Sequence, residues 1–234
     1  MPQYWCVVPA AGMGRRAGGE RPKQYQPLAG RPLLLWTLEA LAAHPAVAGL
    51  MVVLAADDRH WPGLDRVAGK AVLTTTGGAE RVHSVLAGLR ALPTSVAAGD
   101  WVLVHDAARP CLRADDLTRL IDEGTRHAVG ALLAQPMSDT VKRADARRQV
   151  EVTVPRENLW RAQTPQLFRR GELMAALEAS LSIGSLSTDE AKSLELQGKN
   201  PLLVEGSGDN LKVTSAMDLA IAEAVLRAHG RVAS

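Results

Sequence analysis

The sequence predicts an α/β fold, with a mostly parallel sheet that carries helices on both faces. Short apolar runs alternate with longer segments of helical period, which is typical of this class. Of the 234 residues, 47% are hydrophobic and 22% are charged, an ordinary balance for a soluble globular enzyme. We expect one domain over residues 1–234, from which residues 138–158 project as a β-arm.

The period of the apolar residues predicts each element. Predicted strands cover residues 4–8, 50–54, 71–73, 101–104, 130–134 and 202–204. Predicted helices cover residues 32–44, 80–92, 115–127 and 215–228. Ser187 and Glu190 are three residues apart and fit a capping box at one more helix start.

Residues 139–154 break the alternation of strands and helices. A charged turn is followed by three valines in strict alternation: Val150, Val152 and Val154. This pattern predicts a β-hairpin. Because a free two-stranded hairpin is marginally stable in water, we expect an arm that reaches a second subunit. A hairpin that lies on its own domain is the alternative.

Composition and charge exclude several classes of partner. Aromatic residues make up only 3% of the chain, which argues against stacking platforms for single-stranded nucleic acid. The formal charge of +2 is too small for wholesale binding of nucleic acid or acidic membrane. Cys6 and Cys111 form no disulfide framework or metal-ligand spacing. With no membrane-length apolar run, we expect a cytoplasmic protein.

A glycine-rich loop with cationic side chains follows the first strand. Small residues from Pro9 to Gly14 let the backbone turn its amide groups toward an anion. Arg16 and Lys23 bring mobile positive charge to the same place. This arrangement suits a triphosphate.

Three other interpretations of this loop have to be weighed. Gly12-x-Gly14-x-x-Ala17 formally matches a dinucleotide fingerprint. That fingerprint needs a helix that begins in the glycine turn, and Pro22 and the preceding glycines oppose such a helix. It also needs an acidic residue about 20 residues later. A Walker loop is excluded, because no Gly-Lys-Ser/Thr follows the glycines. An ordinary glycine turn with solvated basic residues is the third interpretation.

Two more loops follow predicted strands. In the first, Gly77 and Gly78 would let a planar base lie against the backbone, and Ser84 would face the loop from the helix. We interpret Glu80 as a helix N-terminal residue that is favourable toward the helix dipole. In the second, Asp106 stands at the carboxyl end of a strand, where α/β sheets bind ligands.

Asp106 has the chemistry of a Mg²⁺ ligand, since Mg²⁺ takes one or two carboxylates together with substrate phosphates. Arg109, three residues on, would face a second anionic substrate. We expect His105 to be structural, because no nearby residue resembles a nucleophile. Asp209 and Lys212 stand in a loop before the last helix, and Thr188 follows Ser187 of the expected capping box.

These segments together resemble the 2-C-methyl-D-erythritol 4-phosphate cytidylyltransferases of the non-mevalonate isoprenoid pathway. The resemblance runs in order through residues 9–16, 22–25, 77–85, 104–110, 159–166, 188–191 and 209–214. It implies a Rossmann-like, GT-A-like nucleotidyltransferase fold and a homodimer joined through the 138–158 arm. It also implies transfer of CMP from CTP to the polyol phosphate, with Mg²⁺ as cofactor and pyrophosphate released.

The resemblance further implies the roles of individual residues. The catalytic residues would be Arg16, Lys23, Arg156 and Lys212. Residues that bind CTP would be Ala10, Ala11, Gly12, Gly14, Gly77, Gly78, Ser84, Asp106 and Ala107. Those that bind the polyol phosphate would be Arg109, Thr140, Thr164 and Thr188, with Thr140 and Arg156 supplied by the partner's arm. A metal would be bound by Asp106 and Asp209.

Two alternatives to this function remain open. One is the same reaction on another polyol phosphate, such as ribitol 5-phosphate. The other is a non-catalytic nucleotide-binding relative. The family usually has Asp where this chain has Ala79, which removes an acidic contact on the nucleotide side. Retention of both Arg16 and Lys23 argues for an active enzyme.

Overall fold

The computed structural model describes residues 3–12 and 22–232. Its core is a sheet in which each predicted strand is present. The strands expected from the sequence are β1 (Tyr4–Pro9), β4 (Val47–Leu54), β6 (Lys70–Thr76), β7 (Trp101–Val104), β8 (Gly130–Pro136) and β12 (Leu202–Glu205). Within the described ranges, eight strands join in the order β12-β8-β11-β7-β1-β4-β6-β5.

The sheet is mostly parallel, as predicted, but it also contains antiparallel strands that the sequence pattern did not predict. β1 pairs in parallel with β4 and β7, and β4 with β6. The ten-residue strand β11 (Trp160–Arg169) runs antiparallel between β7 and β8. The short strand β5 (Arg66–Val67) is antiparallel to β6 at the edge. The carboxyl ends of β1, β6 and β7 therefore meet at one edge of the sheet.

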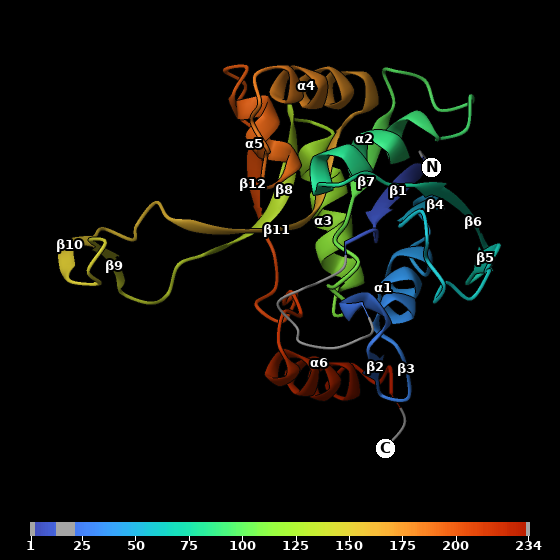
Figure 1. The fold of residues 1–234 in the computed structure, drawn as a ribbon, viewed down its shortest axis with the longest axis horizontal. Helices are drawn as coiled ribbons and strands as arrows, with labels where there is room; N and C mark the ends of the chain where they lie inside the picture. Colours follow the sequence, from blue (N-terminus) through green and yellow to red (C-terminus); the bar gives the residue numbers. More distant parts are fainter. Residues whose placement is uncertain (1–2, 13–21, 233–234) are drawn as a thin grey trace.

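Helices cover both faces of the sheet (Figure 1). Leucines of α1 (Leu33–Ala42) and α3 (Ala114–Gly124) pack in one apolar cluster against one face. The other face is covered by α2 (Arg81–Arg90), α4 (Arg170–Ser182) and α5 (Glu190–Glu195). The last helix, α6 (Ala216–Ala228), packs on Trp36 and Leu28 beside the short hairpin of β2 (Pro27–Leu28) and β3 (Arg31–Pro32).

The predicted hairpin is present and extends away from the body of the chain (Figure 1). Its strands are β9 (Val141–Ala144) and β10 (Val150–Val154), paired antiparallel. Val150 is 64% exposed and Val152 is 39% exposed. Within this protomer, the hairpin therefore leaves apolar side chains in solvent.

One predicted cap is wrong. Asp189, not Ser187, is the N-cap of α5, and its side chain accepts from the Lys192 backbone amide at 3.0 Å. The Ser187 hydroxyl instead bonds the Ser193 hydroxyl at 2.8 Å. Both Ser-x-x-Glu and Asp-x-x-Lys place a capping side chain three residues before an amide, so the local pattern does not choose between them.

None of the helices in the described ranges combines the length and apolar character needed to cross a bilayer.

Candidate active site

The first glycine loop follows β1 and leads to the short helix η2 (Lys23–Tyr25). Ala10 is buried, and its amide donates to the Val53 carbonyl at 2.8 Å. Gln24 of η2 donates to the Ala10 carbonyl at 2.6 Å, so η2 is fastened to the start of the loop. Lys23 is half-buried on η2, and Ala11 and Gly12 continue from Ala10. Gly14 and Arg16 lie outside the described residues.

The second glycine loop is folded against the first helical turn of α2. The Gly78 amide donates to the Ser84 hydroxyl at 3.3 Å. A Cβ on Gly77 would lie 2.6 Å from that hydroxyl oxygen and 2.7 Å from the Ala11 Cβ. Only glycine fits this close approach of the two predicted loops. Glu80 is the N-cap of α2, in agreement with its predicted helix-terminal role.

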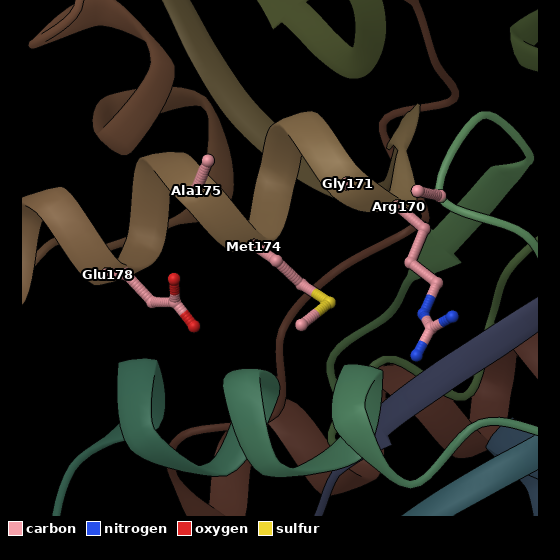
Figure 2. Close-up of a pocket in the computed structure, with 6 residues that line it drawn as sticks. Arg170, Gly171, Met174, Ala175 and Glu178 are labelled. Atoms are coloured by element: carbon pink, nitrogen blue, oxygen red, sulfur yellow. The ribbon is translucent and has the colours of Figure 1, made fainter.

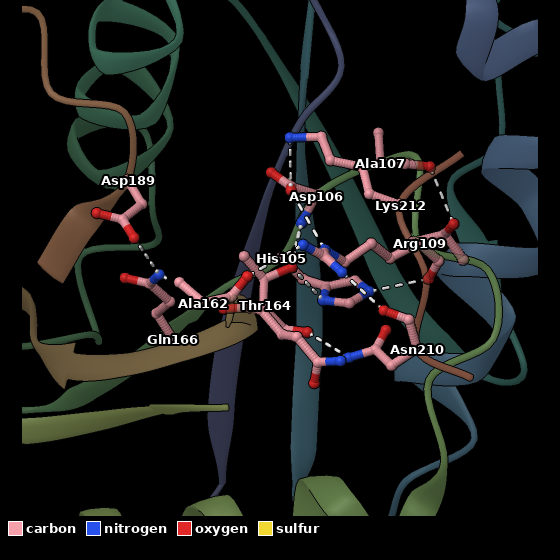
Figure 3. Close-up of polar contacts among 12 residues, drawn as sticks. His105, Asp106, Ala107, Arg109, Ala162, Thr164, Gln166, Asp189, Asn210 and Lys212 are labelled. Atoms are coloured by element: carbon pink, nitrogen blue, oxygen red, sulfur yellow. Dashed lines mark hydrogen bonds and ion pairs between the residues drawn. The ribbon is translucent and has the colours of Figure 1, made fainter. Parts of the chain in front are cut away.

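Asp106 is the centre of a buried cluster of charges (Figure 3). Its Oδ2 accepts from Lys212 Nζ at 2.9 Å and from Arg109 Nε at 3.4 Å. Its Oδ1 accepts from Arg81 Nη2 at 3.1 Å and from Arg81 Nε at 3.2 Å. Burial would raise the pKa of Asp106, but these three cations outweigh it and hold the pKa well below its usual range.

Thr164 fixes the backbone of Asp106 from the neighbouring strand. The register of β11 against β8 shifts between Ala162 and Gln166, and Thr164 lies in this irregular stretch. Its hydroxyl oxygen accepts from the Asp106 amide at 3.0 Å and is 2.9 Å from His105 Nδ1. His105 Nε2 faces the Arg109 carbonyl at 3.1 Å.

These contacts determine the state of His105. A carbonyl only accepts, so Nε2 carries the proton; Nδ1 then accepts from the Thr164 hydroxyl. Burial lowers the pKa of His105 to about 4, which keeps the ring neutral at physiological pH. His105 is structural, as predicted. The hydroxyl proton of Thr164 is held by His105 in this arrangement.

Arg109 is nine-tenths buried and bound on several sides. Besides Asp106, it donates to the Asn210 carbonyl at 2.7 Å and to the Ala162 carbonyl at 3.5 Å. Asn210 in turn donates to the Thr164 carbonyl at 2.8 Å. The loop with Lys212 is thus fastened to the loop with Asp106. Ala107 is buried here, and its carbonyl accepts from the Thr37 hydroxyl at 2.9 Å.

The remaining predicted residues lie at the periphery or on the arm. Thr188 is exposed one residue before the N-cap of α5. Thr140 and Arg156 are exposed at the base of the arm, where Arg156 donates to the Ser138 carbonyl. Among the described residues, neither Thr140 nor Arg156 contacts Asp106 of the same protomer. Their predicted role depends on a second copy of the chain.

Asp106 fits a Mg²⁺ ligand better than Asp209 does. One carboxylate in the midst of a phosphate-binding set is what Mg²⁺ commonly uses, with phosphate and water oxygens as its other ligands. Asp209 Oδ2 pairs with Arg113 and with His229 Nε2, at 3.0 Å from the latter, and neither partner belongs to the Asp106 cluster. Asp209 Oδ1 is buried, with no hydrogen-bond partner among the described residues. No metal-sized group of three acidic, His or Cys side chains occurs in the described ranges.

Two residues of the cluster were not predicted as site residues. Arg81 reaches Asp106 from α2, and the same guanidinium contacts Glu190 of α5. Glu190 is fully buried. Arg81 and Glu190 are 109 positions apart in the sequence, so no local pattern could indicate the pair. Both residues do lie in segments that carry the family resemblance, 77–85 and 188–191, but the resemblance gave them no role.

Two surface depressions lie away from this cluster. One of about 310 Å³ is lined by residues of α4 and by Ala98, with Arg170, Met174 and Glu178 around it (Figure 2). Glu178 pairs there with Arg90, at the opposite end of α2 from Arg81. The other, of about 590 Å³, borders β6. Neither depression is lined by a predicted site residue, so the charged cluster remains the candidate site.

Known proteins of one family are similar to this chain. Residues 4–228 match the model of the family described as 2-C-methyl-D-erythritol 4-phosphate cytidylyltransferase (IspD). The enzyme of that name from Stenotrophomonas maltophilia is 57% identical over 222 residues, 95% of this chain and 96% of that protein. One from Xylella fastidiosa is 55% identical over 215 residues, 92% of this chain and 93% of that protein. The crystal structure of the Francisella tularensis enzyme superposes with a TM-score of 0.81 at 33% identity, covering 96% of this chain and 100% of that one.

A mostly parallel sheet with glycine loops and a cationic cluster at its carboxyl edge is the architecture of a nucleotidyltransferase, and this chain is an enzyme of that class. The matches over nearly its whole length are more specific. The chain belongs to the 2-C-methyl-D-erythritol 4-phosphate cytidylyltransferase family.

Proposed function

We propose that this chain transfers CMP from CTP to 2-C-methyl-D-erythritol 4-phosphate, and that it releases pyrophosphate. Family membership supports the substrate pair. The observation that carries the mechanism is the convergence of Arg81, Arg109 and Lys212 on the buried Asp106, beside two glycine loops. Such a site offers positive charge at the edge of the sheet where the glycine loops lie, and positive charge stabilises phosphates.

The reaction needs positioning and charge stabilisation more than proton transfer. A phosphate oxygen of the acceptor attacks the α-phosphorus of CTP, a new P–O bond forms, and the bond to the departing pyrophosphate breaks. The second pKa of a phosphate monoester is about 6, so the nucleophile is already ionised at neutral pH. A general base is unnecessary, and neutral His105, with both ring nitrogens engaged, fits that requirement.

The cationic side chains have distinct places in this proposal. Lys23 on η2 stabilises charge on the α-phosphate from the side of the first loop, together with Arg16, which lies outside the described residues. Lys212 is 39% exposed and so can leave Asp106 for an incoming phosphate. Arg109 is held too firmly by backbone carbonyls to move far. We assign Arg109 to shaping the acceptor side of the site.

Mg²⁺ is the proposed cofactor, with Asp106 as its protein ligand. When bound, it would neutralise charge on the triphosphate and orient it. We keep Asp209 out of the metal's immediate shell, because its partners Arg113 and His229 lie outside the Asp106 cluster, whereas Asp106 follows β7 at the carboxyl edge of the sheet.

The proposed active form is a homodimer in the cytoplasm. Support for the dimer is the exposure of the valines on β10 and of Thr140 and Arg156 at the base of the arm. In a dimer these two polar residues would complete the partner's acceptor site.

Pyrophosphate release from CTP and Mg²⁺ tests the proposal directly. Release with 2-C-methyl-D-erythritol 4-phosphate, and none with ribitol 5-phosphate or without acceptor, is the expected result. Release with ribitol 5-phosphate alone would keep the mechanism and refute the acceptor. If folded protein that binds CTP releases no pyrophosphate with either acceptor, the enzymatic function is refuted.

Lys23→Ala tests the charge-stabilising role within that assay. Loss of one transition-state donor typically lowers turnover by about 10²–10³-fold, and we expect kcat to fall by at least this much. The circular dichroism spectrum should stay that of the wild type, because Lys23 is only half-buried. Near-normal turnover would remove Lys23 from the mechanism.

A further inference from the structure

Glu190 is a fully buried carboxylate that the proposed reaction does not use. It belongs to the short helix α5, whose N-cap is Asp189, so capping does not explain it. Burial of a carboxylate is costly unless a cation compensates it. Its compensation is Arg81, whose Nη2 donates to Glu190 Oε2 at 3.1 Å while Nη1 donates to Oε1.

Arg81 is therefore shared between two carboxylates. Glu190 takes the two terminal nitrogens as a bidentate pair. Arg81 Nε and Nη2 also donate to Asp106, and both contact only its Oδ1. This division leaves Asp106 Oδ2 to Lys212 at 2.9 Å and to Arg109 at 3.4 Å.

Glu190 is held in place from the sheet. The Ala191 amide donates to Gln166 Oε1 at 2.9 Å, and Gln166 Nε2 donates to Asp189 Oδ2 at 3.2 Å. Gln166 lies on β11, two residues beyond Thr164, which fixes the Asp106 backbone. Figure 3 shows the Gln166–Asp189 contact beside the Asp106 cluster. One strand thus anchors both carboxylates that share Arg81.

We propose that Glu190 is a positioning residue that acts through Arg81. By holding the guanidinium in a bidentate pair, it restricts Arg81 to one oxygen of Asp106 and keeps the other oxygen for Lys212. Without the Glu190 charge, Arg81 turns its terminal nitrogens to both oxygens of Asp106 and displaces the Lys212 ammonium. The inference rests on the proposed function, because Lys212 is the group whose place it sets.

Glu190→Gln (E190Q) is the principal test, since it keeps the shape of the side chain and removes its charge. We expect kcat to fall at least tenfold. The KM for CTP should change less than threefold, because the Ala10–Gly12 and Gly77–Gly78 loops are untouched. A kcat within twofold of wild type would overturn the proposal.

Ser193→Ala is the matched control on the same helix. Ser193 is fully buried and bonds Ser187, which lies outside the charged cluster. The loss of this hydrogen bond should lower the melting temperature and leave kcat within twofold. If S193A lowers kcat as much as E190Q does, α5 has a merely structural role and the proposal fails.

The dependence on Arg81 has its own test. Since Glu190 acts through Arg81, adding E190Q to Arg81→Gln should change kcat by less than twofold. A further tenfold loss in the double variant would show an independent role. If E190Q does not fold, Glu190→Asp keeps the charge with a shorter reach; we expect at least a threefold lower kcat, and unchanged kcat overturns the proposal.

A crystal structure of E190Q decides the geometry whatever the turnover. We expect Arg81 on both oxygens of Asp106 and the Lys212 ammonium displaced. An unchanged Lys212–Asp106 contact would refute the inference even if the wild-type chain proved inactive. Wild-type inactivity with the rearranged contact present would instead refute the proposed function alone.

Discussion

The Asp106 cluster and the 138–158 arm both contain acidic and basic side chains, but the two regions differ in how far those side chains are buried. Around Asp106, the carboxylates of Asp106 and Glu190 and the Arg109 guanidinium are buried, and each of them has charged or polar partners. On the arm, charges of both signs are exposed, and the Arg143–Glu151 pair at 3.3 Å has side chains that are 69% and 50% exposed. The same kind of ion pair is worth about 0–1 kcal/mol at a surface but is costly to break when buried.

This difference indicates which of the two regions has its interaction partners within one protomer. The amide and both carboxylate oxygens of Asp106 have partners in four segments of the same chain, through Thr164, Arg81, Arg109 and Lys212. The arm buries little of its own apolar surface, and a two-stranded hairpin alone is marginally stable. We therefore expect substitutions in the cluster to act at any protein concentration, and those on the arm to act through a partner.

Asp106→Asn is expected to have the largest effect on both activity and stability. It leaves Arg81, Arg109 and Lys212 without their common carboxylate. Breaking a buried ion pair costs about 3–5 kcal/mol, and kcat should fall by at least about 10²–10³-fold. Urea unfolding and the pyrophosphate assay measure the two losses.

Asp139→Asn makes the same chemical change on the arm and serves as the control. Asp139 is exposed, and surface substitutions usually change the free energy of unfolding by less than about 0.5 kcal/mol. Equal losses of stability in the two variants would break the distinction between the regions.

The buried His105 predicts how the stability of the cluster depends on pH. Its pKa is near 6.5 in the unfolded chain, and burial lowers it to about 4 in the fold. Between these values the unfolded state binds more protons, so the free energy of unfolding falls as the pH is lowered from 6.5 to 4. The loss is about 3 kcal/mol at most.

Urea unfolding of the wild type and of His105→Gln at pH 7, 5.5 and 4.5 tests this contribution. The variant is less stable at pH 7, because Thr164 loses its acceptor, but it should lose less stability on acidification. If both proteins show the same pH dependence, His105 is not the titrating group.

The sequence predicted the fold well where a residue's role depends on its near neighbours. The parallel strands, the helices α1, α2, α3 and α6 and the turns after β1, β6 and β7 all follow from local period and from glycine or proline positions. The 13-residue helix α4 was missed. β11 was missed because Pro165 and the polar residues around it are atypical of a central strand. The break in its register is also what brings Thr164 to Asp106.

The candidate site was predictable only in part, for a related reason. Asp106 stands at a strand end, and strand order alone directs it to the ligand-binding edge. Glu190 matched a local capping pattern, which concealed its pairing with Arg81. That contact joins helices α2 and α5 across 109 positions and depends on how both pack on the sheet. Sequence patterns indicate position along a helix but not a partner on another helix.

Val150→Ser on the arm should have the smallest effect on the isolated protomer. Because Val150 is 64% exposed, we expect the free energy of unfolding at high dilution to change by less than about 0.5 kcal/mol. In a dimer the lost apolar burial is roughly 1–1.5 kcal/mol per protomer, which corresponds to about a tenfold or greater rise in the dimer dissociation constant. Sedimentation equilibrium and unfolding at several protein concentrations separate the two effects.

A loss above 1 kcal/mol at high dilution would mean that the arm packs on its own protomer. An unchanged dissociation constant would mean that Val150 lies outside any interface, and the contrast with the Asp106 cluster would then rest on exposure alone.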